Sequence, residues 1–198
     1  IFVRSPHPHA KIKKIKTEAA LTVPGVVSIL SAEDVENDGL RAMKPFITSN
    51  PNTKHPFNFI PQPLLAKKLV RYVGEPILLV LAKSIYAALD AVQLIEVDYD
   101  VLPFVLSAQE ALKEDSPLVA EALGTNLCLN WRCSSNENID VIFSKAKHVI
   151  ELNINNNRIV SNPMEPRGAT AFWDQDTNKY TIYASSQNIH VMRDTVAS

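Results

Sequence analysis

Few side chains in this 198-residue chain have the types and spacing that enzymes use for chemistry. Glu165 lies between Met164 and Pro166, with Arg167 close behind it. A carboxylate in such an apolar setting must be paired, so we interpret Glu165 and Arg167 as a structural ion pair, or Glu165 as hydrogen-bonded to backbone. No serine, histidine and aspartate follow the nucleophile-elbow pattern. We therefore expect no catalytic residue in this chain.

Histidine and cysteine give little support for a metal site. His7 and His9 would place two imidazoles on one strand face, but no third ligand is near in the sequence, so we favour a surface turn. Cys128 and Cys133 are the only cysteines, which excludes a four-thiolate iron–sulfur cluster made by this chain alone. Five residues apart on a predicted strand, they would point to opposite faces. We expect two reduced, partly buried thiols in a cytoplasmic protein.

Composition excludes several classes of partner. The five glycines are widely spaced, so the chain has neither GxGxxG nor a P-loop and should not bind NAD, FAD or ATP by those routes. A formal net charge of −1 predicts no nucleic acid and no acidic membrane as a partner. The one dense basic run, at 11–14, is expected to be the solvated face of a strand. No apolar run is long enough to span a bilayer, and no signal peptide opens the chain.

The segment 71–103 predicts the clearest arrangement of elements. Residues 76–82 are apolar and fit a strand buried on both faces. Ser84 can cap a helix whose apolar stripe would comprise Ile85, Ala88, Leu89 and Val92. Residues 95–99 then alternate apolar and acidic, as in a half-buried strand. We expect a compact right-handed βαβ unit.

Other elements follow from shorter patterns. Strands are predicted at 2–4, 11–16, 26–30, 127–133 and 148–155, a hairpin at 169–173 and 180–184, and helices from 31, at 108–113, at 139–145 and from about 188. The proline-rich residues 36–63 predict a long surface excursion. A domain boundary is expected near 115–126. The chain opens inside a strand pattern and ends inside a helix pattern, so we expect a fragment or a split subunit.

Three blocks, in order, resemble the large subunits of the molybdenum hydroxylases, the family of aldehyde oxidase, xanthine dehydrogenase and aerobic carbon monoxide dehydrogenase. They are FVRSPHPHAKIKKI with PGVVSIL, RYVGEP with VDYDVLP, and NNRIVSNPMEPRGATAFWD with YTIYASSQNIHVMRD. The resemblance covers essentially the whole chain. It implies an α+β fold: a hammerhead-like domain with a βαβ unit at 1–118, then the first mixed strands and helix of a molybdopterin-binding domain at 119–198.

The resemblance also implies a chemistry and a set of contacts. The family hydroxylates aldehydes, purines or related small substrates with oxygen from water. Related large subunits place a glutamine, which contacts a molybdenum ligand, near Asn157; asparagine keeps the amide but is one methylene shorter. Asn157, Arg158 and Gln187 are thus candidate cofactor-binding residues, while an Asn-rich turn (for Asn157) and a cap or internal contact (for Gln187) are the alternatives.

The implied partners are the rest of the large subunit, iron–sulfur and FAD subunits or domains, and a small-molecule substrate. Because the family's glycine-rich cofactor loops and catalytic glutamate come later in the large subunit, this chain alone should be inactive and retain no stoichiometric molybdenum. The alternative is a non-catalytic structural or interaction module that keeps the fold without the cofactor.

Overall fold

A computed structural model of the chain describes residues 1–43, 57–130, 138–157, 159–160, 162–165 and 168–197. The chain divides into two compact units, Ile1–Ser134 and Ser135–Ser198. The predicted surface excursion at 36–63 lies partly outside the described residues; on its two sides, Met43 and Gln62 pair in an isolated antiparallel bridge. The predicted domain boundary at 118/119 stays a prediction.

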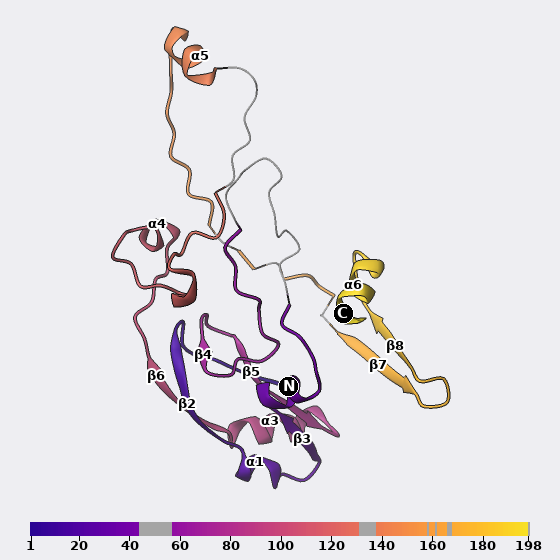
Figure 1. Cartoon of the computed structure of the whole chain (residues 1–198). Helices are drawn as coiled ribbons and strands as arrows, with labels where there is room; N and C mark the ends of the chain where they lie inside the picture. Colours follow the sequence, from indigo (N-terminus) through magenta and orange to yellow (C-terminus); the bar gives the residue numbers. More distant parts are fainter. Residues whose placement is uncertain (44–56, 131–137, 158, 161, 166–167, 198) are drawn as a thin grey trace. The chain divides into compact units, whose positions relative to one another are not determined.

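The first sheet of the N-terminal unit has the strand order β1–β5–β3, with β5 in the centre (Figure 1). These strands are β1 (Phe2–Arg4), β5 (Pro76–Ala82) and β3 (Val26–Leu30). Both neighbours run antiparallel to β5, which places Phe2 and Leu30 on either side of Leu79. The central strand β5 carries the longest apolar run, which suits a strand whose two faces are both covered by other parts of the chain.

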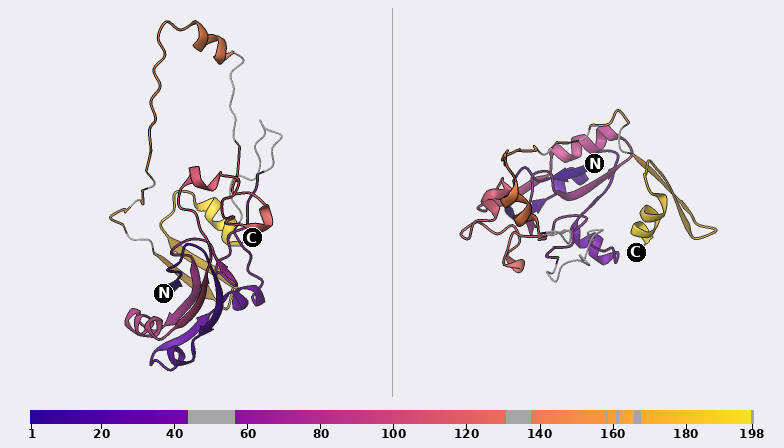
Figure 2. Two further views of the ribbon diagram at one scale, coloured as in Figure 1. Left: turned by 90° about the vertical axis from the view of Figure 1, so that its left-hand side faces the viewer. Right: turned by 90° about the horizontal axis from the view of Figure 1, so that it is seen from above.

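The second sheet has the order β4–β2–β6, and its two long strands run side by side (Figure 2). The strands are β2 (Ala10–Lys16), β4 (Leu69–Val70) and β6 (Glu96–Val101). Antiparallel pairing sets lysines opposite acids: Lys11 faces Asp100, Lys14 faces Asp98, and Lys16 faces Glu96. The lysines are exposed, so the prediction of a solvated strand face is confirmed.

The predicted βαβ unit is confirmed as an order of elements but not as a crossover. Strand β5, helix α3 (Ile85–Gln93) and β6 follow one another as expected. However, β5 pairs with β1 and β3 while β6 pairs with β2, all antiparallel. The expected right-handed parallel crossover is therefore wrong, because each strand finds its partners in a different sheet.

Helix α3 packs through small residues. Ser84 caps it by accepting a hydrogen bond from the amide of Ala87, as predicted. The buried face contains Ala88 and Ala91, whereas Ile85 and Leu89 are exposed, so the predicted stripe is only partly right. Alanines let the helix lie close to its neighbours: a Cβ added at Gly25, whose φ is +94°, would come within 3.3 Å of the Cβ of Ala87.

Two apolar clusters make up the core of the N-terminal unit. One contains Ala10, Ala66, Val70, Ile77 and Leu78, and the other Ala20, Val80, Ala88 and Ala91. Strand β5 contributes Ile77 and Leu78 to the first cluster and Val80 to the second, so apolar residues are needed along most of its length.

Short helices connect the strands. They are α1 (Glu18–Leu21), α2 (Ala32–Asn37), α4 (Ala108–Ala111) and the 3₁₀ turn η1 (Glu121–Leu123). Helix α2 begins at Ser31 as predicted. The structure adds a capping box, in which the side chains of Ser31 and Asp34 each accept a hydrogen bond from the backbone N–H of the other residue.

The C-terminal unit contains helix α5 (Ile139–Lys145), the hairpin of β7 (Ala169–Asp174) and β8 (Lys179–Ala184), and helix α6 (Ile189–Ala197). All four were predicted. The strand expected at 148–155 is wrong: the segment has no regular structure and pairs with none of the described strands. Residues 127–130 likewise form no strand, and 131–133 lie outside the described residues.

Among the described residues of the C-terminal unit, none is buried. The exposure is clearest in the segment 148–155, which was expected to form a strand. Its alternating apolar residues Ile150, Leu152 and Ile154 are 92%, 76% and 79% exposed. An alternating pattern gives a stable strand only where a neighbouring strand and a core accept its two sides. This unit supplies neither to the described segment.

Candidate cofactor-binding site

The junction between β8 and α6 positions one of the candidate residues. Asn188 caps α6, since its Oδ1 accepts a hydrogen bond from the amide of Val191 at 3.1 Å, and its own amide donates to the Oγ of Ser186 at 3.1 Å. The cap role considered for Gln187 thus belongs to its neighbour. Gln187 is exposed, and none of the hydrogen bonds found among the described residues uses its side chain.

Glu165 lies against the same junction. Its Oε1 accepts a hydrogen bond from the Oγ of Ser185 at 2.5 Å, which joins two segments 20 residues apart. Glu165 is exposed, contrary to the expected apolar burial, and a hydroxyl rather than a cation is its observed partner. Arg167 lies outside the described residues, so their ion pair stays a prediction. The structure thus brings Glu165 close to the loop that carries Gln187.

Asn157 is exposed and has irregular backbone, and Arg158 lies outside the described residues. None of the hydrogen bonds found among the described residues uses the Asn157 side chain. No hydrogen bond among the described residues thus supports the alternative role of Asn157 in a turn. Among the same residues, no contact joins Asn157 to Gln187 either.

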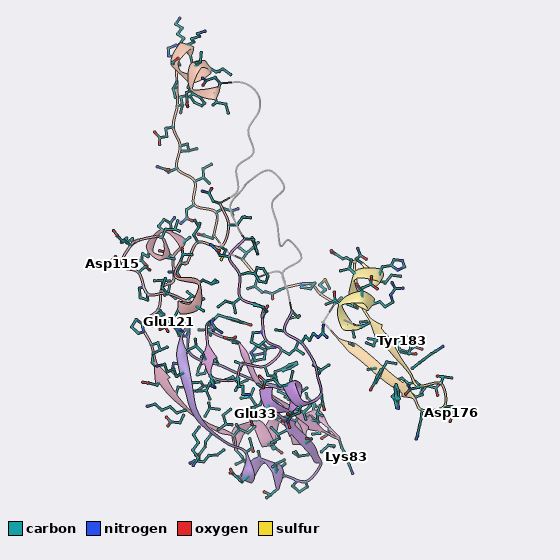
Figure 3. All side chains as sticks on the ribbon, in the orientation of Figure 1. Glu33, Lys83, Asp115, Glu121, Asp176 and Tyr183 are labelled. Atoms are coloured by element: carbon teal, nitrogen blue, oxygen red, sulfur yellow. The ribbon has the colours of Figure 1, made fainter. Side chains whose placement is uncertain are left out.

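The hairpin carries an aromatic pair and an ordered turn. Trp173 and Tyr180 face each other across the strands, with ring centroids 4.3 Å apart. The carboxylate of Asp174 accepts hydrogen bonds from the amides of Asp176 and Thr177. Its pKa is held below the usual value, first by the side chain of Thr177 and then by these two amides. Asp176, in this turn, and Tyr183 on β8 are labelled in Figure 3. These bonds order the turn that joins β7 and β8, and β8 leads into the junction with α6.

The N-terminal unit holds a buried carboxylate that the sequence did not reveal. Glu75 is 3% exposed, and its Oε2 accepts a hydrogen bond from the amide of Arg71 at 2.5 Å. Burial raises the pKa of Glu75, while the hydrogen bond and the charge of Arg71 act against the rise. Glu75 stands at the start of an apolar strand, and this placement was the only available signal.

The environment of His9 also differs from the predicted surface turn. It is 7% exposed, and its Nδ1 lies 2.8 Å from the carbonyl oxygen of Pro103, which can only accept, so Nδ1 is protonated. His7 packs edge-on against Tyr99. The turn predicted to lie on the surface is thus partly core for His9. Among the described residues there is no group of three or more histidine, cysteine or acidic residues able to hold a metal.

Asn126 was missed as well, and it fastens the segment that follows α4. Its Nδ2 donates to the carbonyl oxygens of Ala111 and Pro117, both at 3.0 Å, and its Oδ1 accepts from the amide of Val119 at 2.9 Å. One side chain thus satisfies three backbone groups of the segment 111–119.

The donor set of the C-terminal unit fits a polar organic cofactor in part. The amides of Asn157 and Gln187 are exposed and can donate to oxygen or accept from nitrogen. The five glycines of the chain are dispersed, so no glycine-rich loop is present to cradle a pyrophosphate. These residues can therefore form part of a cofactor site.

Comparison with known families decides the assignment. Residues 1–103 match the aldehyde oxidase and xanthine dehydrogenase a/b hammerhead domain, and residues 119–198 match the molybdopterin cofactor-binding domain. The chain belongs to the aldehyde oxidase and xanthine dehydrogenase family. The resemblance and the fold class inferred from the sequence are both confirmed, and the molybdopterin-binding domain is the family unit to which Asn157 and Gln187 belong.

Individual relatives are molybdenum oxidoreductase large subunits. The chain is 30% identical to the carbon monoxide dehydrogenase large chain of Afipia carboxidovorans, over 99% of this chain and 24% of that protein. It is 33% identical to the nicotine 6-hydroxylase large subunit of Paenarthrobacter nicotinovorans, over 97% of this chain and 22% of that protein. The chain thus spans about a quarter of the length of these relatives.

Solved structures support the same family assignment. The Cu,Mo-CO dehydrogenase matches with a TM-score of 0.85 at 30% identity, over 100% of this chain and 25% of that one. Quinoline 2-oxidoreductase from Pseudomonas putida 86 matches with a TM-score of 0.83 at 30% identity, over 100% of this chain and 24% of that one. Among the described residues, no helix is long and apolar enough to cross a membrane.

Proposed function

We propose that this chain is the N-terminal part of the large subunit of a molybdenum-cofactor oxidoreductase that hydroxylates a small substrate, such as an aldehyde or a purine, with oxygen from water. The observation that carries the proposal is the succession of the hammerhead match and the molybdopterin-binding match in one chain. Relatives of different substrate class match about equally well, so no particular substrate is favoured.

Within this proposal, residues 1–118 form the hammerhead domain and 119–198 begin the molybdopterin-binding domain. When bound, the molybdenum cofactor supplies the oxygen-transfer and electron-accepting chemistry. Asn157, Arg158 and Gln187 would hold and orient it through amide and guanidinium hydrogen bonds. Glu165, through Ser185, would keep the loop that carries Gln187 in place. No residue of this chain acts as the catalytic base.

The lack of buried residues in the described C-terminal unit supports the proposed partners. Apolar side chains on α5 and α6 are largely exposed, including Phe143 at 58%, Ile189 at 68% and Val196 at 63%. So much exposed apolar surface is characteristic of an interface. We propose that the rest of the large subunit covers it.

Iron–sulfur and FAD subunits or domains would complete the electron path. Relatives named as a subunit of a complex, such as the 6-hydroxypseudooxynicotine dehydrogenase complex subunit gamma, support partner subunits in general. A cytoplasmic location is proposed with them; the exposed free thiol of Cys128 is compatible with a reducing compartment.

The competing function is a structural or interaction module without cofactor. A test purifies the assembly that contains this chain by an affinity tag and measures dye reduction with a panel of aldehydes, purines and N-heterocycles. The proposal predicts substrate-dependent reduction. An assembly that reduces no dye with any substrate would favour the module.

The same assembly tests the residue roles. Asn157→Ala and Gln187→Ala should each lower turnover by about 10- to 100-fold, the usual effect of removing a group that orients a metal centre. Gln175→Ala, which removes an amide from the β7–β8 turn, is the matched control and should leave turnover unchanged. If Asn157→Ala and Gln187→Ala kept the turnover of the unaltered assembly, as Gln175→Ala should, then Asn157 and Gln187 would not belong to the site.

A further inference from the structure

A hollow of about 380 Å³ opens in the N-terminal unit, which has no part in the cofactor contacts proposed above. Its floor is apolar: Ile77 and Leu78 of β5 are 0% and 2% exposed, and Ala66 is 2% exposed. Ile15 of β2 and Ile29 of β3 also line the hollow, beside the hydroxyl-bearing Thr17 and Ser31. An aliphatic group placed on this floor would bury apolar surface.

The rim of the hollow is acidic. Glu33 and Asp34 of α2 line it together with Lys67, and Glu36 binds Lys67 at 2.6 Å. The charge of the Lys67 ammonium is thus already paired, and the hydrogen bond that it donates to Glu36 raises its pKa. Asp34 is committed to the capping box with Ser31.

Glu33 is the carboxylate left available. It lies 3.9 Å from Lys67, at the limit of an ion pair, and its side chain is 73% exposed. Glu33 is labelled in Figure 3. An apolar floor beneath an available carboxylate suits a group with an aliphatic stem and a cationic head.

We propose that this hollow receives an arginine or lysine side chain of a neighbouring polypeptide in the assembly, with its methylene stem over Ile77 and Leu78 and its head on Glu33. Charge complementarity supports this occupant, since the carboxylates of Glu33 and Asp34 line the hollow and Glu36 pairs with the one lining ammonium group, that of Lys67. The guanidinium is the better fit, because its planar fork can bind a carboxylate through two hydrogen bonds. The relatives that are named as subunits of complexes make a neighbouring polypeptide available.

A probe experiment on the 198-residue chain tests the chemistry of the site. Titration with n-butylguanidinium should shift the methyl resonances of Ile15, Ile29, Ile77 and Leu78 in a saturable way, whereas the neutral isostere n-butylurea should bind about 3- to 10-fold more weakly. Equal affinity for the two probes, or no saturation by n-butylguanidinium, would overturn the proposal.

Variants assign the effect to the rim. Glu33→Gln with Glu36→Gln should abolish the preference for n-butylguanidinium without changing the spectrum elsewhere. Glu121→Gln, on η1 and outside the hollow, is the matched control and should keep the preference. A double variant that discriminates between the probes as well as the unaltered chain does would contradict the role of the rim.

Carbodiimide footprinting of the tagged assembly tests the occupant itself. Labelling of Glu33 should be at least about fivefold slower in the assembly than in the isolated chain, because an ion-paired carboxylate at a covered site reacts slowly. Glu121 provides an internal reference. Equal labelling of Glu33 in both samples would show that no neighbouring side chain occupies the hollow.

Discussion

Glu75 shows how a single side chain couples stability to pH. Its carboxylate is almost fully buried and accepts a hydrogen bond from the amide of Arg71, while the buried Nε of Arg71 has no hydrogen-bond partner among the described residues. Burial raises the Glu75 pKa above its unfolded value. A raised carboxyl pKa means that its contribution to stability is fully present below the unfolded pKa and is lost as pH rises through the folded pKa.

We therefore expect Glu75→Gln, which keeps an oxygen for the Arg71 amide, to be at least as stable as the unaltered chain at pH 7. Its advantage should shrink toward zero as pH falls below the unfolded pKa. Glu75→Ala should lose about 1–3 kcal/mol, because the Arg71 amide is left without an acceptor. Urea unfolding at several pH values measures both. A glutamine variant less stable than the alanine variant would contradict this account.

At the residue scale, the environment of a side chain was the part that the sequence did not predict. The binding roles of Asn157 and Gln187 stay predictions, while the burial of Glu75 and His9 and the exposure of Glu165 were not foreseen. Burial depends on which segment lies above a residue, and neighbours in the sequence do not encode that. His9 is covered by Pro103, which is 94 residues away.

Local sequence signals determine where the helices and strands of this chain begin and end. They do not determine which strands pair with one another. Caps at Ser31, Ser84 and Ser107 begin helices where the sequence predicted them. The hairpin is fixed by the Asp174 turn and by Asn178, which adopts a left-handed φ of 54°. By contrast, the sheet assignments of β5 and β6 could not be predicted, because alternation defines a face and not a neighbouring strand.

A cap variant tests the local part of this account. Ser84→Ala should destabilise the N-terminal unit by about 1 kcal/mol, since the amide of Ala87 loses its acceptor at the start of α3. Ser84→Asp should remain within a few tenths of a kcal/mol of the unaltered chain, because aspartate caps equally well. Thermal or urea unfolding measures the difference. An alanine variant as stable as the aspartate variant would show that the cap does not contribute.

The whole molecule joins a unit that has a core to one whose described residues do not. Two apolar clusters stabilise the N-terminal unit, whereas the described part of the C-terminal unit contains no buried residue. A two-stranded hairpin and short helices without a shared core are marginally stable in water.

Residues 1–134 should therefore unfold cooperatively when produced alone, and residues 135–198 should not. Urea titration followed by circular dichroism and by amide hydrogen exchange would show a sigmoidal transition for the first segment and a gradual one for the second. A cooperative transition in residues 135–198 alone would refute the view that this unit needs other polypeptide to fold.

Molybdenum content is the most direct measurement of the central claim, that this chain is part of a molybdenum-cofactor large subunit. The assembly purified from cells by a tag on this chain should contain close to one molybdenum per copy by elemental analysis, while the 198-residue chain alone should contain almost none, because it lacks a pyrophosphate cradle. An assembly free of molybdenum, from cells that load other molybdenum enzymes normally, would contradict the account.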